Sequence, residues 1–474
     1  MSPRRLLVIS YHYPPDGAVG GLRWAGLTRG LSELGWSSWV LTAAQGSIED
    51  VPGVVVVRPA RRMTLNDRYV AWRRSRSVAQ PEPSRSVAQP EPSRPVASAS
   101  DGANTPRGLS SFREFVSNAG LVLSLPDDGR GWILRATFAA RKLIRTIKPS
   151  VVITSGPPHS AHIVGRLACW PGGPDRFIDL RDPILSRAYT PLGPVHGPVR
   201  RSIERFAIAS ARGAICVTAE SAAELAGRHP ALRVEHVPNG VDLTTIPAAA
   251  DAQTPFPGLS IAHVGTLYAS RDPSIALRAM RRFVDRHPDA RDALKLRLVG
   301  GVERLFAERL AALSRALELN WNIEMVNAMP RVDALQMLRR SRVALIFAQR
   351  QVVQVPAKLY EAAAIARDVI VVTEPDSASA QEAARIGASV VAPDDDEALA
   401  VRLERVWRGE RLNDRSADVV RAIDYRVIAR RLADVLDDHS ATTPENSVAS
   451  TEGGSQTAVV RAAPGQGPGA AQLT

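Results

Sequence analysis

Short apolar runs alternate with longer amphipathic segments along most of this chain. The first run, residues 6–10, precedes a segment with helical apolar spacing over residues 22–34, and Gly35 follows where a C-cap glycine belongs. Further apolar runs occupy residues 39–41 and 54–57. Because a strand, a helix and a strand in this order form a parallel sheet with a crossover helix, the pattern predicts an α/β fold.

The same alternation predicts the remaining elements. Strands are expected over residues 151–154, 177–180, 214–217, 259–264, 296–299, 323–326, 343–347 and 369–373. Helices are expected over residues 132–147, 273–287, 302–317, 332–341, 358–366 and 398–408, with one ending at residue 168, one starting near residue 221 and a last one ending at residue 436. We therefore expect two Rossmann-like, doubly wound parallel sheets.

The length of the chain also predicts two domains, because 474 residues are too many for one hydrophobic core. A turn-rich stretch at residues 237–242 marks the junction. We expect a first domain over residues 1–240 and a second over residues 241–438.

A tandem repeat interrupts the first domain. Residues 75–83, SRSVAQPEP, recur at once as residues 84–92. Such Pro-, Ser-, Gln- and Glu-rich sequence cannot bury a core, so we expect a disordered insertion over about residues 73–108. The Ser-, Thr-, Gly- and Pro-rich residues 439–474 are expected to form a disordered tail.

The net charge and the cysteines indicate which classes of partner and cofactor to expect. The net charge of +12 favours anionic partners such as nucleotide phosphates, an anionic membrane face or nucleic acid, although Arg-rich coding alone would also produce it. Nucleic acid is disfavoured because the charge is dispersed and no aromatic stacking motif accompanies it. The two cysteines, Cys169 and Cys216, have no metal-ligand spacing, and no metal or cofactor is expected.

The sequence has no segment that predicts secretion or membrane insertion. The apolar run after Met1 is too short for a signal peptide, and no run approaches the roughly 20 apolar residues of a membrane helix. We expect a cytoplasmic protein.

Ligands of open parallel sheets bind beyond the carboxyl ends of the strands, so the loops there hold the candidate site residues. Glycines at residues 17–21, Gly20 and Gly21 among them, precede a helix and would let the backbone approach an anion. A tight turn without a ligand is the alternative. The G-x-G-x-x-G spacing of a dinucleotide site is absent.

Two further loops of the first domain carry polar candidates. His159 follows a strand and precedes a helix, where a neutral imidazole could bond a sugar hydroxyl or act as an acid or base. A structural role is the alternative. Asp179 and Asp182 flank Arg181 after the next strand, and they could position an acceptor hydroxyl or form a local ion-pair network.

Two loops of the second domain suit a diphosphate. Gly265 and Thr266 form an amide-rich turn followed by Arg271 at a helix start. Lys358 opens another helix, where its charge opposes the helix dipole unless an anionic ligand neutralises both, and Glu361 lies one turn later on the same side. A local Lys–Glu surface pair is the alternative.

Six stretches in this order resemble glycosyltransferase family 4, retaining enzymes of the GT-B fold, and most closely the branch that builds bacterial capsular and other envelope polysaccharides. They are YHYPPDGAVGGLR from Tyr11, SGPPHSAH from Ser155, DLRDP from Asp179, HVPNGVD from His236, HVGTLYASRDP from His263 and VPAKLYEAAAIARDVI from Val355. Together they span about residues 4–395. The resemblance implies that the two domains face a central cleft and that the last helix can pack back on the first domain.

The resemblance also implies roles for the candidate residues. It places Gly20 and Gly21 near the donor phosphates and the acceptor, and His159 near the reacting sugar. Arg271 and Lys358 match the pair that neutralises the leaving diphosphate. Glu361 matches the acid that binds the nucleotide ribose, and residues 325–331 lie where the family contacts the base.

One position departs from the family pattern. Many relatives carry two glutamates in this motif, but Val353 stands where the first is expected, beside Gln351 and Gln354. The departure puts the donor-sugar contacts in doubt. It leaves open a degenerate GT-B scaffold or regulator without turnover, and a nucleotide-sugar epimerase is a further alternative.

The expected reaction is metal-independent transfer of a sugar from a nucleotide-sugar donor to a cell-envelope glycan or lipid-linked acceptor. Front-face attack, with the leaving phosphate taking the acceptor proton, would leave His159 an orienting role. Residues 132–148 are basic, so peripheral contact with the inner face of a membrane is a weaker hypothesis than an ordinary surface helix.

Overall fold

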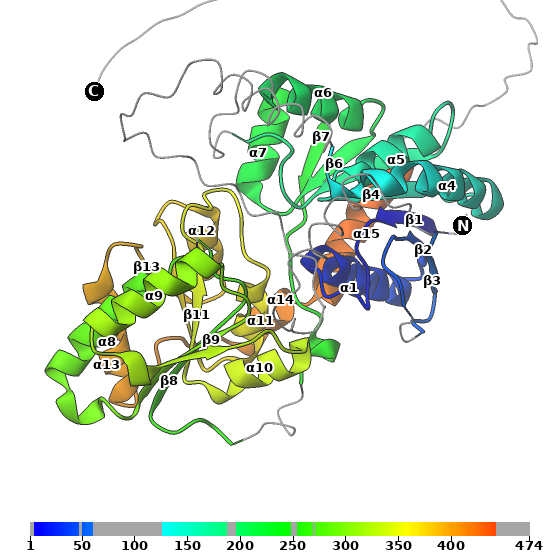
Figure 1. Ribbon diagram of the computed structural model, residues 1–474. Coiled ribbons are helices and arrows are strands. Elements are labelled where there is room, and N and C mark those ends of the chain that lie inside the picture. Colours follow the sequence, from blue (N-terminus) through cyan, green and yellow to red (C-terminus); the bar gives the residue numbers. More distant parts are fainter. Residues whose placement is uncertain are drawn as a thin grey trace, which may run out of the picture.

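The computed structural model describes residues 4–46, 50–59, 126–186, 196–247, 254–268 and 271–441 (Figure 1). The predicted insertion at residues 73–108 lies outside the described residues, as does the predicted tail from residue 442. The last helix extends to Ala441, so residues 439–441 are helical where the sequence predicted the start of the tail.

The first sheet is parallel and has seven strands in the described residues, in the order β3-β2-β1-β4-β5-β6-β7. The strands are β1 (Arg5–Ser10), β2 (Ser37–Leu41), β3 (Val54–Val57), β4 (Val151–Gly156), β5 (Asp175–Leu180), β6 (Gly213–Cys216) and β7 (Arg233–His236). Its helices are α1 (Val19–Glu33), α4 (Ile133–Ile147) after a 3-10 turn at Asp128–Trp132, α5 (Ser160–Ala168), α6 (His196–Ile208) and α7 (Ala219–Arg228). The central strands β1 and β4 are buried on both faces, which is why they appear in the sequence as continuous apolar runs.

The second sheet is also parallel, with six strands in the described residues in the order β10-β9-β8-β11-β12-β13. The strands are β8 (Leu259–Val264), β9 (Leu294–Val299), β10 (Ile323–Val326), β11 (Val343–Phe347), β12 (Asp368–Val372) and β13 (Ser389–Val391). Its helices are α8 (Ser274–Arg286), α9 (Arg304–Ala316), α10 (Arg331–Arg340), α11 (Lys358–Ile365), α12 (Ala378–Arg385) and α13 (Asp396–Trp407), with α14 (Ala417–Ala422) and α15 (Tyr425–Ala441) last. Short 3-10 turns lie at Leu243–Thr245, Pro288–Ala290 and Asn320–Asn322.

Helices cover both faces of each sheet (Figure 1). On the first sheet, Leu27 of α1 shares a core with Ile153 of β4, while Val164 of α5 shares another with Val152. Successive strand residues point to opposite faces, so these two cores lie on opposite sides of the sheet. The structure confirms the predicted α/β class and the two doubly wound, GT-B-like sheets.

The last helix belongs in space to the first sheet (Figure 1). Tyr425 and Leu432 of α15 lie in the same core as Leu27 of α1. Glycines allow the two helices to approach closely, because a Cβ on Gly26 would lie 2.2 Å from the Tyr425 ring and one on Gly30 would lie 2.7 Å from the Ala429 Cβ. The chain therefore crosses between the sheets twice, and the two crossings pair where Val241 donates to the Ile423 carbonyl at 2.9 Å.

The sequence analysis missed five elements: β7, β13, α6, α12 and α14. Strand β7 has only one apolar residue and β13 has only three residues, so neither forms an apolar run that alternation can reveal. None of the helices in the described parts of the chain is long and apolar enough to cross a membrane.

Candidate functional site

The strand order of each sheet reverses at one point, and the candidate residues lie at these two points. In the first sheet the reversal falls between β1 and β4, and in the second it falls between β8 and β11. The carboxyl ends of neighbouring parallel strands open a crevice there, which is where ligands of such folds bind. Each candidate residue follows one of these four strands or β5: Gly20 and Gly21 follow β1, His159 follows β4, Asp182 follows β5, Gly265, Thr266 and Arg271 follow β8, and Lys358 and Glu361 follow β11.

The loops from the two sheets meet directly. Gln354, in the loop between β11 and α11, donates from Nε2 to Asp182 Oδ1 at 2.6 Å. The neighbouring Val353 carbonyl accepts hydrogen bonds from the hydroxyls of Thr218 and Ser221, at 2.9 and 3.2 Å. These contacts bring the first sheet's candidate Asp182 to the same junction as the loop that leads to Lys358.

Lys358 is a buried cation without a hydrogen-bonding partner among the described residues. Its Nζ lies against Gly265, where a Cβ would be only 1.8 Å away, and Gly265 has a φ of +137° that side chains disfavour. An unpartnered buried polar atom costs free energy, and a buried charge costs more, unless a ligand satisfies it. Lys358 also opens α11, where the helix amides add a positive potential.

The surroundings of Lys358 make the ammonium easy to deprotonate. Burial, with a further contribution from the Arg271 guanidinium, lowers the pKa of Lys358 to about 7, and Glu361 opposes the shift. The Arg271 Nε is likewise buried without a partner among the described residues, and its guanidinium lies 4.8 Å from the Tyr268 ring centre. Two cations and a helix N-terminus thus converge, and neither cation forms an ion pair among the described residues, an arrangement suited to an anion.

Glu361 has a different partner from the one that the sequence suggested. Its Oε1 accepts from Nε and from Nη2 of Arg331, each at 2.7 Å. Arg331 is the first residue of α10 and also donates to the Thr245 carbonyl at 3.3 Å. In the described part of the chain Lys358 and Glu361 form no ion pair, so the alternative of a local Lys–Glu surface pair does not describe them.

The structure corrects the predicted position of Gly20 and Gly21. Helix α1 begins at Val19, so Gly20 and Gly21 lie in its first turn and not in a loop before it. A Cβ on Gly20 would lie 2.2 Å from Cζ of Arg181, and one on Gly21 would lie 2.9 Å from Cα of Tyr13. Their small size therefore lets protein atoms approach, and Gly20 accommodates the Arg181 guanidinium.

Asp179 belongs to a buried network, which the sequence had left as one of two readings. It is fully buried and accepts from Trp24 Nε1 at 2.9 Å, Ser155 Oγ at 2.8 Å and Arg23 Nη2 at 3.1 Å. These bonds join α1 to β4 and β5. Asp179 holds the loops in place from beneath, whereas the half-buried Asp182 lies at the junction with Gln354.

His159 precedes the first residue of α5 and is half-buried, with its Nδ1 enclosed and without a partner among the described residues. Burial lowers the pKa of His159 to about 4; Asp182 opposes the shift, and Arg200 and Arg181 add to it. The imidazole is therefore neutral near pH 7. A neutral ring has one nitrogen that donates and one that accepts, so it can orient a hydroxyl.

Sequence reasoning did not single out His162 or His263 as functional candidates. It named Arg331 only as the end of the segment expected at the base and Arg181 only as the residue between the two carboxylates. His162 and His263 are in motifs that it quoted, but their burial gave no signal in the sequence. His263 donates from Nδ1 to the Leu345 carbonyl at 2.8 Å, and its Nε2 is buried near Gly265 and Lys358. Among the described residues no cluster of three His, Cys, Asp or Glu side chains could hold a metal ion.

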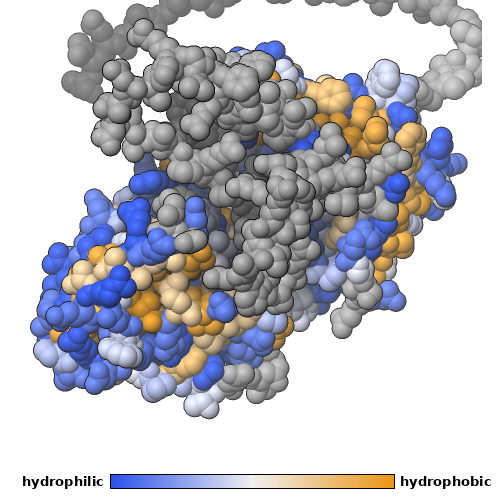
Figure 2. All heavy atoms as spheres, viewed as in Figure 1, coloured by the Kyte–Doolittle hydropathy of each residue, from blue (hydrophilic) through white to orange (hydrophobic). Residues whose placement is uncertain are grey.

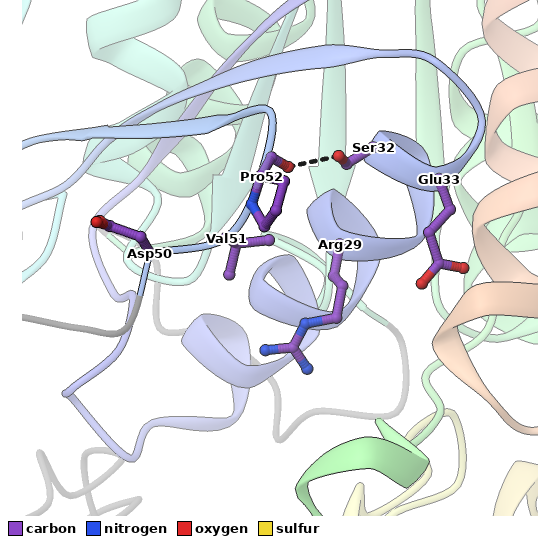
Figure 3. Close-up of a pocket in the computed structure, with 6 residues that line it drawn as sticks. All are labelled: Arg29, Ser32, Glu33, Asp50, Val51 and Pro52. Atoms are coloured by element: carbon purple, nitrogen blue, oxygen red, sulfur yellow. Dashed lines mark hydrogen bonds between the residues drawn. The ribbon is translucent and has the colours of Figure 1, made fainter.

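A shallow pocket of about 270 Å³ lies apart from these residues (Figure 3). It is lined by α1 and by the segment before β3, where Ser32 donates to the Pro52 carbonyl at 2.5 Å. Two of its charged residues are already engaged, Arg29 by Asp242 and Glu33 by Arg426. The pocket is therefore a seam between helix and loop and not a second candidate site.

The fold defines the class of protein that this chain resembles, a two-sheet GT-B architecture. Sucrose-phosphate synthase from Thermosynechococcus elongatus matches with a TM-score of 0.61 at 15% identity, covering 93% of this chain and 100% of that one. Anabaena HepE in complex with UDP and glucose matches with a TM-score of 0.56 at 12% identity, covering 92% and 99%. The lipopolysaccharide outer core galactosyltransferase WaaB, in its apo form, matches with a TM-score of 0.52 at 11% identity, covering 92% and 99%.

One family model also matches the sequence. The model of Glycosyltransferase Family 4 matches residues 96–245, a stretch that contains His159 and Asp182. A search of curated proteins found no match. The family model and the solved structures together support the resemblance to glycosyltransferase family 4.

Proposed function

We propose that this chain is a retaining glycosyltransferase that moves a hexose from a nucleotide-sugar donor to a glycan or lipid-linked acceptor of the cell envelope, on the cytoplasmic side. The observation that carries the proposal is the Lys358 Nζ, a buried ammonium without a partner among the described residues, beside Arg271 at the start of α11. A diphosphate supplies the missing counter-charge. The UDP and glucose in the Anabaena structure agree with such a donor.

The second sheet would hold the donor. Lys358, Arg271 and the first amides of α11 stabilise the charge that develops on the leaving diphosphate, and the amide-rich turn at Gly265 and Thr266 lets it approach. Glu361, steadied by Arg331, would accept from the ribose hydroxyls. Because the cations already compensate the charge, we propose a metal-independent reaction.

The first sheet would present the acceptor. The bond from the anomeric carbon to the diphosphate breaks with an oxocarbenium-like transition state. The acceptor oxygen bonds to the same face of that carbon, and its proton passes to the leaving phosphate oxygen. His159 orients the acceptor hydroxyl, and Asp182, anchored by Gln354, borders the acceptor.

Calorimetric binding of UDP-, GDP- and ADP-sugars to the wild type and to Lys358→Ala tests the donor site. Loss of a charge-assisted phosphate contact should cost about 1.5–3 kcal/mol, so the variant should bind about ten- to a hundredfold more weakly. Lys148→Ala, at the exposed end of α4, is the control and should bind like the wild type. Equal binding by Lys358→Ala would contradict the donor site.

A second candidate function is a GT-B scaffold that binds nucleotide without turnover. Val353 favours it, because its carbonyl accepts the two hydrogen bonds at the junction and its side chain offers no acid for the donor sugar. Product analysis with and without a lipid-linked acceptor separates the candidates. Transfer supports the enzyme, binding without any product supports the scaffold, and conversion of the donor alone identifies an epimerase.

Peripheral contact with an anionic membrane is a further part of the proposal. Helix α4 exposes Leu134 and Phe138, at 69% and 68%, together with Arg135, Lys142 and Arg145. Figure 2 shows apolar side chains gathered at the end of the molecule where Figure 1 places α4 and α5. Cosedimentation should rise with anionic lipid and fall in Phe138→Ser; insensitivity to lipid charge would refute the contact.

A further inference from the structure

A second histidine lies one turn after His159 on α5 and has no role in the proposed reaction. His162 is completely buried, and its ring stacks on that of His159 with 5.7 Å between centres and 26° between planes. Burying an imidazole costs free energy unless its nitrogens are satisfied. The position therefore needs a physical account.

The hydrogen bonds around His162 determine which nitrogen carries its proton. Thr154 Oγ1 donates its single hydrogen to the Phe177 carbonyl at 3.3 Å and lies 2.8 Å from His162 Nδ1. With the hydroxyl hydrogen on that carbonyl, the hydroxyl oxygen accepts from Nδ1, and we assign the ring proton of His162 to Nδ1 on this basis. Burial lowers the pKa of His162 well below its usual value, so the ring is neutral and its Nε2 is a bare acceptor.

The acceptor of His162 and the enclosed nitrogen of His159 face the same point. A Cβ on Gly156, the last residue of β4, would lie 2.6 Å from His162 Nε2 and 3.0 Å from His159 Nδ1. Glycine leaves this space open. Both nitrogens are buried, and neither has a hydrogen-bond partner among the described residues.

We propose that His162 is a positioning residue whose Nε2 accepts a hydrogen bond from Nδ1–H of His159 and so fixes the tautomer of His159. Catalytic hydrogen bonds are often long in ligand-free sites and shorten when the substrate binds. With Nδ1 protonated, His159 Nε2 carries the lone pair. Before the bond to the diphosphate breaks, Nε2 accepts the hydrogen of the acceptor hydroxyl and turns an oxygen lone pair toward the anomeric carbon. As charge develops on the leaving phosphate, that same hydrogen passes to the phosphate oxygen.

This assignment rests on the proposed function only in placing the acceptor beside His159. The charged groups that bear on the two rings are Asp182, Glu204, Arg181, Arg200 and Arg176. Three are cations and two are anions, so they do not by themselves favour a charged pair. A neutral donor–acceptor pair is the arrangement that satisfies both buried nitrogens.

The test compares His162→Phe, His162→Gln and Thr154→Val with the wild type in the full chain. His162→Phe keeps a stacked ring without an acceptor, and kcat should fall about tenfold, as for one lost hydrogen bond. His162→Gln places an amide oxygen near the Nε2 position and should recover most of kcat. Thr154→Val frees the tautomer of His162 and should lower kcat less than His162→Phe does. His287→Phe, at the end of α8, is the control and should leave kcat unchanged.

Two readouts separate positioning from a structural role and from the proposed function. Nucleotide affinity, set on the second sheet, should stay constant in all variants, and side-chain ¹⁵N spectra should show His159 as the Nδ1–H tautomer in the wild type and as a mixture in His162→Phe. An unchanged tautomer, an unchanged kcat or an equal loss of nucleotide affinity would overturn the inference. If the wild type neither binds nucleotide nor transfers sugar, the proposed function fails, and the tautomer spectra still decide whether the two rings are paired.

Discussion

The two sheets differ in the hydrogen-bond partners of the charged groups near their loops. Asp179 accepts hydrogen bonds from Arg23, Trp24 and Ser155, so donors of the protein itself stabilise its negative charge. Lys358 and Arg271, by contrast, each have a buried nitrogen, Nζ and Nε, without a hydrogen-bond partner among the described residues. The first network stabilises the fold, whereas the second is the one that we propose a ligand completes.

The largest expected effect is a loss of folding stability when the hydrogen-bond network around Asp179 is broken. Asp179→Ala leaves Arg23, only 1% exposed, without its counter-charge, and removing one partner of a buried pair costs about 3–5 kcal/mol. Urea unfolding followed by tryptophan fluorescence measures this loss. Asp285→Ala removes an exposed carboxylate paired with Arg281 and should cost less than about 1 kcal/mol. Equal losses of stability in the two variants would contradict the stabilising role of the buried network around Asp179.

A pH dependence is expected where the network is incomplete. Because the pKa of Lys358 is lowered to about 7 in the empty site and a bound diphosphate favours the ammonium, binding takes up a proton above that pH. Affinity for a nucleotide sugar should therefore fall as the pH rises from about 7, by up to about tenfold per pH unit. Calorimetry in buffers of different ionisation enthalpy measures the uptake directly. Lys358→Arg keeps its charge and should bind with little pH dependence, and a flat profile for the wild type would contradict this account.

The smallest expected effect is a loss of nucleotide affinity when the partly exposed ion pair between Arg331 and Glu361 is removed. Such a pair contributes at most about 1 kcal/mol, so Arg331→Ala should weaken nucleotide binding by less than about fivefold. Arg339→Ala, two turns later on α10, does not contact Glu361 and serves as the matched control in the same titration. A loss as large as that of Lys358→Ala would mean that Arg331 itself contacts the ligand.

Sequence patterns predicted the parts of the fold that bury apolar residues on both sides. The run at β11 was located to the residue because all five residues of this strand are apolar and buried. Strands β7 and β13, each at an edge of its sheet, are mostly not buried, so their sequences need not form an apolar run. Helix α14, which buries none of its residues, carries no apolar stripe for the same reason.

The candidate site was predictable only where it follows from chain order. Lys358 and His159 could be proposed because each stands just after a strand, where ligands bind. The partner of Glu361, the pairing of Gln354 with Asp182 and the burial of His162 depend on contacts between segments far apart in the chain. No local pattern encodes such contacts. Gly20 and Gly21 illustrate the same limit, since the neighbours that require a small residue there, Arg181 and Tyr13, come from other segments.

The return of α15 to α1 sets an order of events during synthesis. The first sheet leaves the ribosome early, but Tyr425, Ile428 and Leu432, which complete its core, are made near the end of the chain. Until then the side of α1 that carries Gly26 and Gly30 lacks the helix that packs against it. The second sheet, by contrast, has the last residue of its core, Ile423, before α15 begins. The part of the protein that is translated first is therefore the part that finishes folding last.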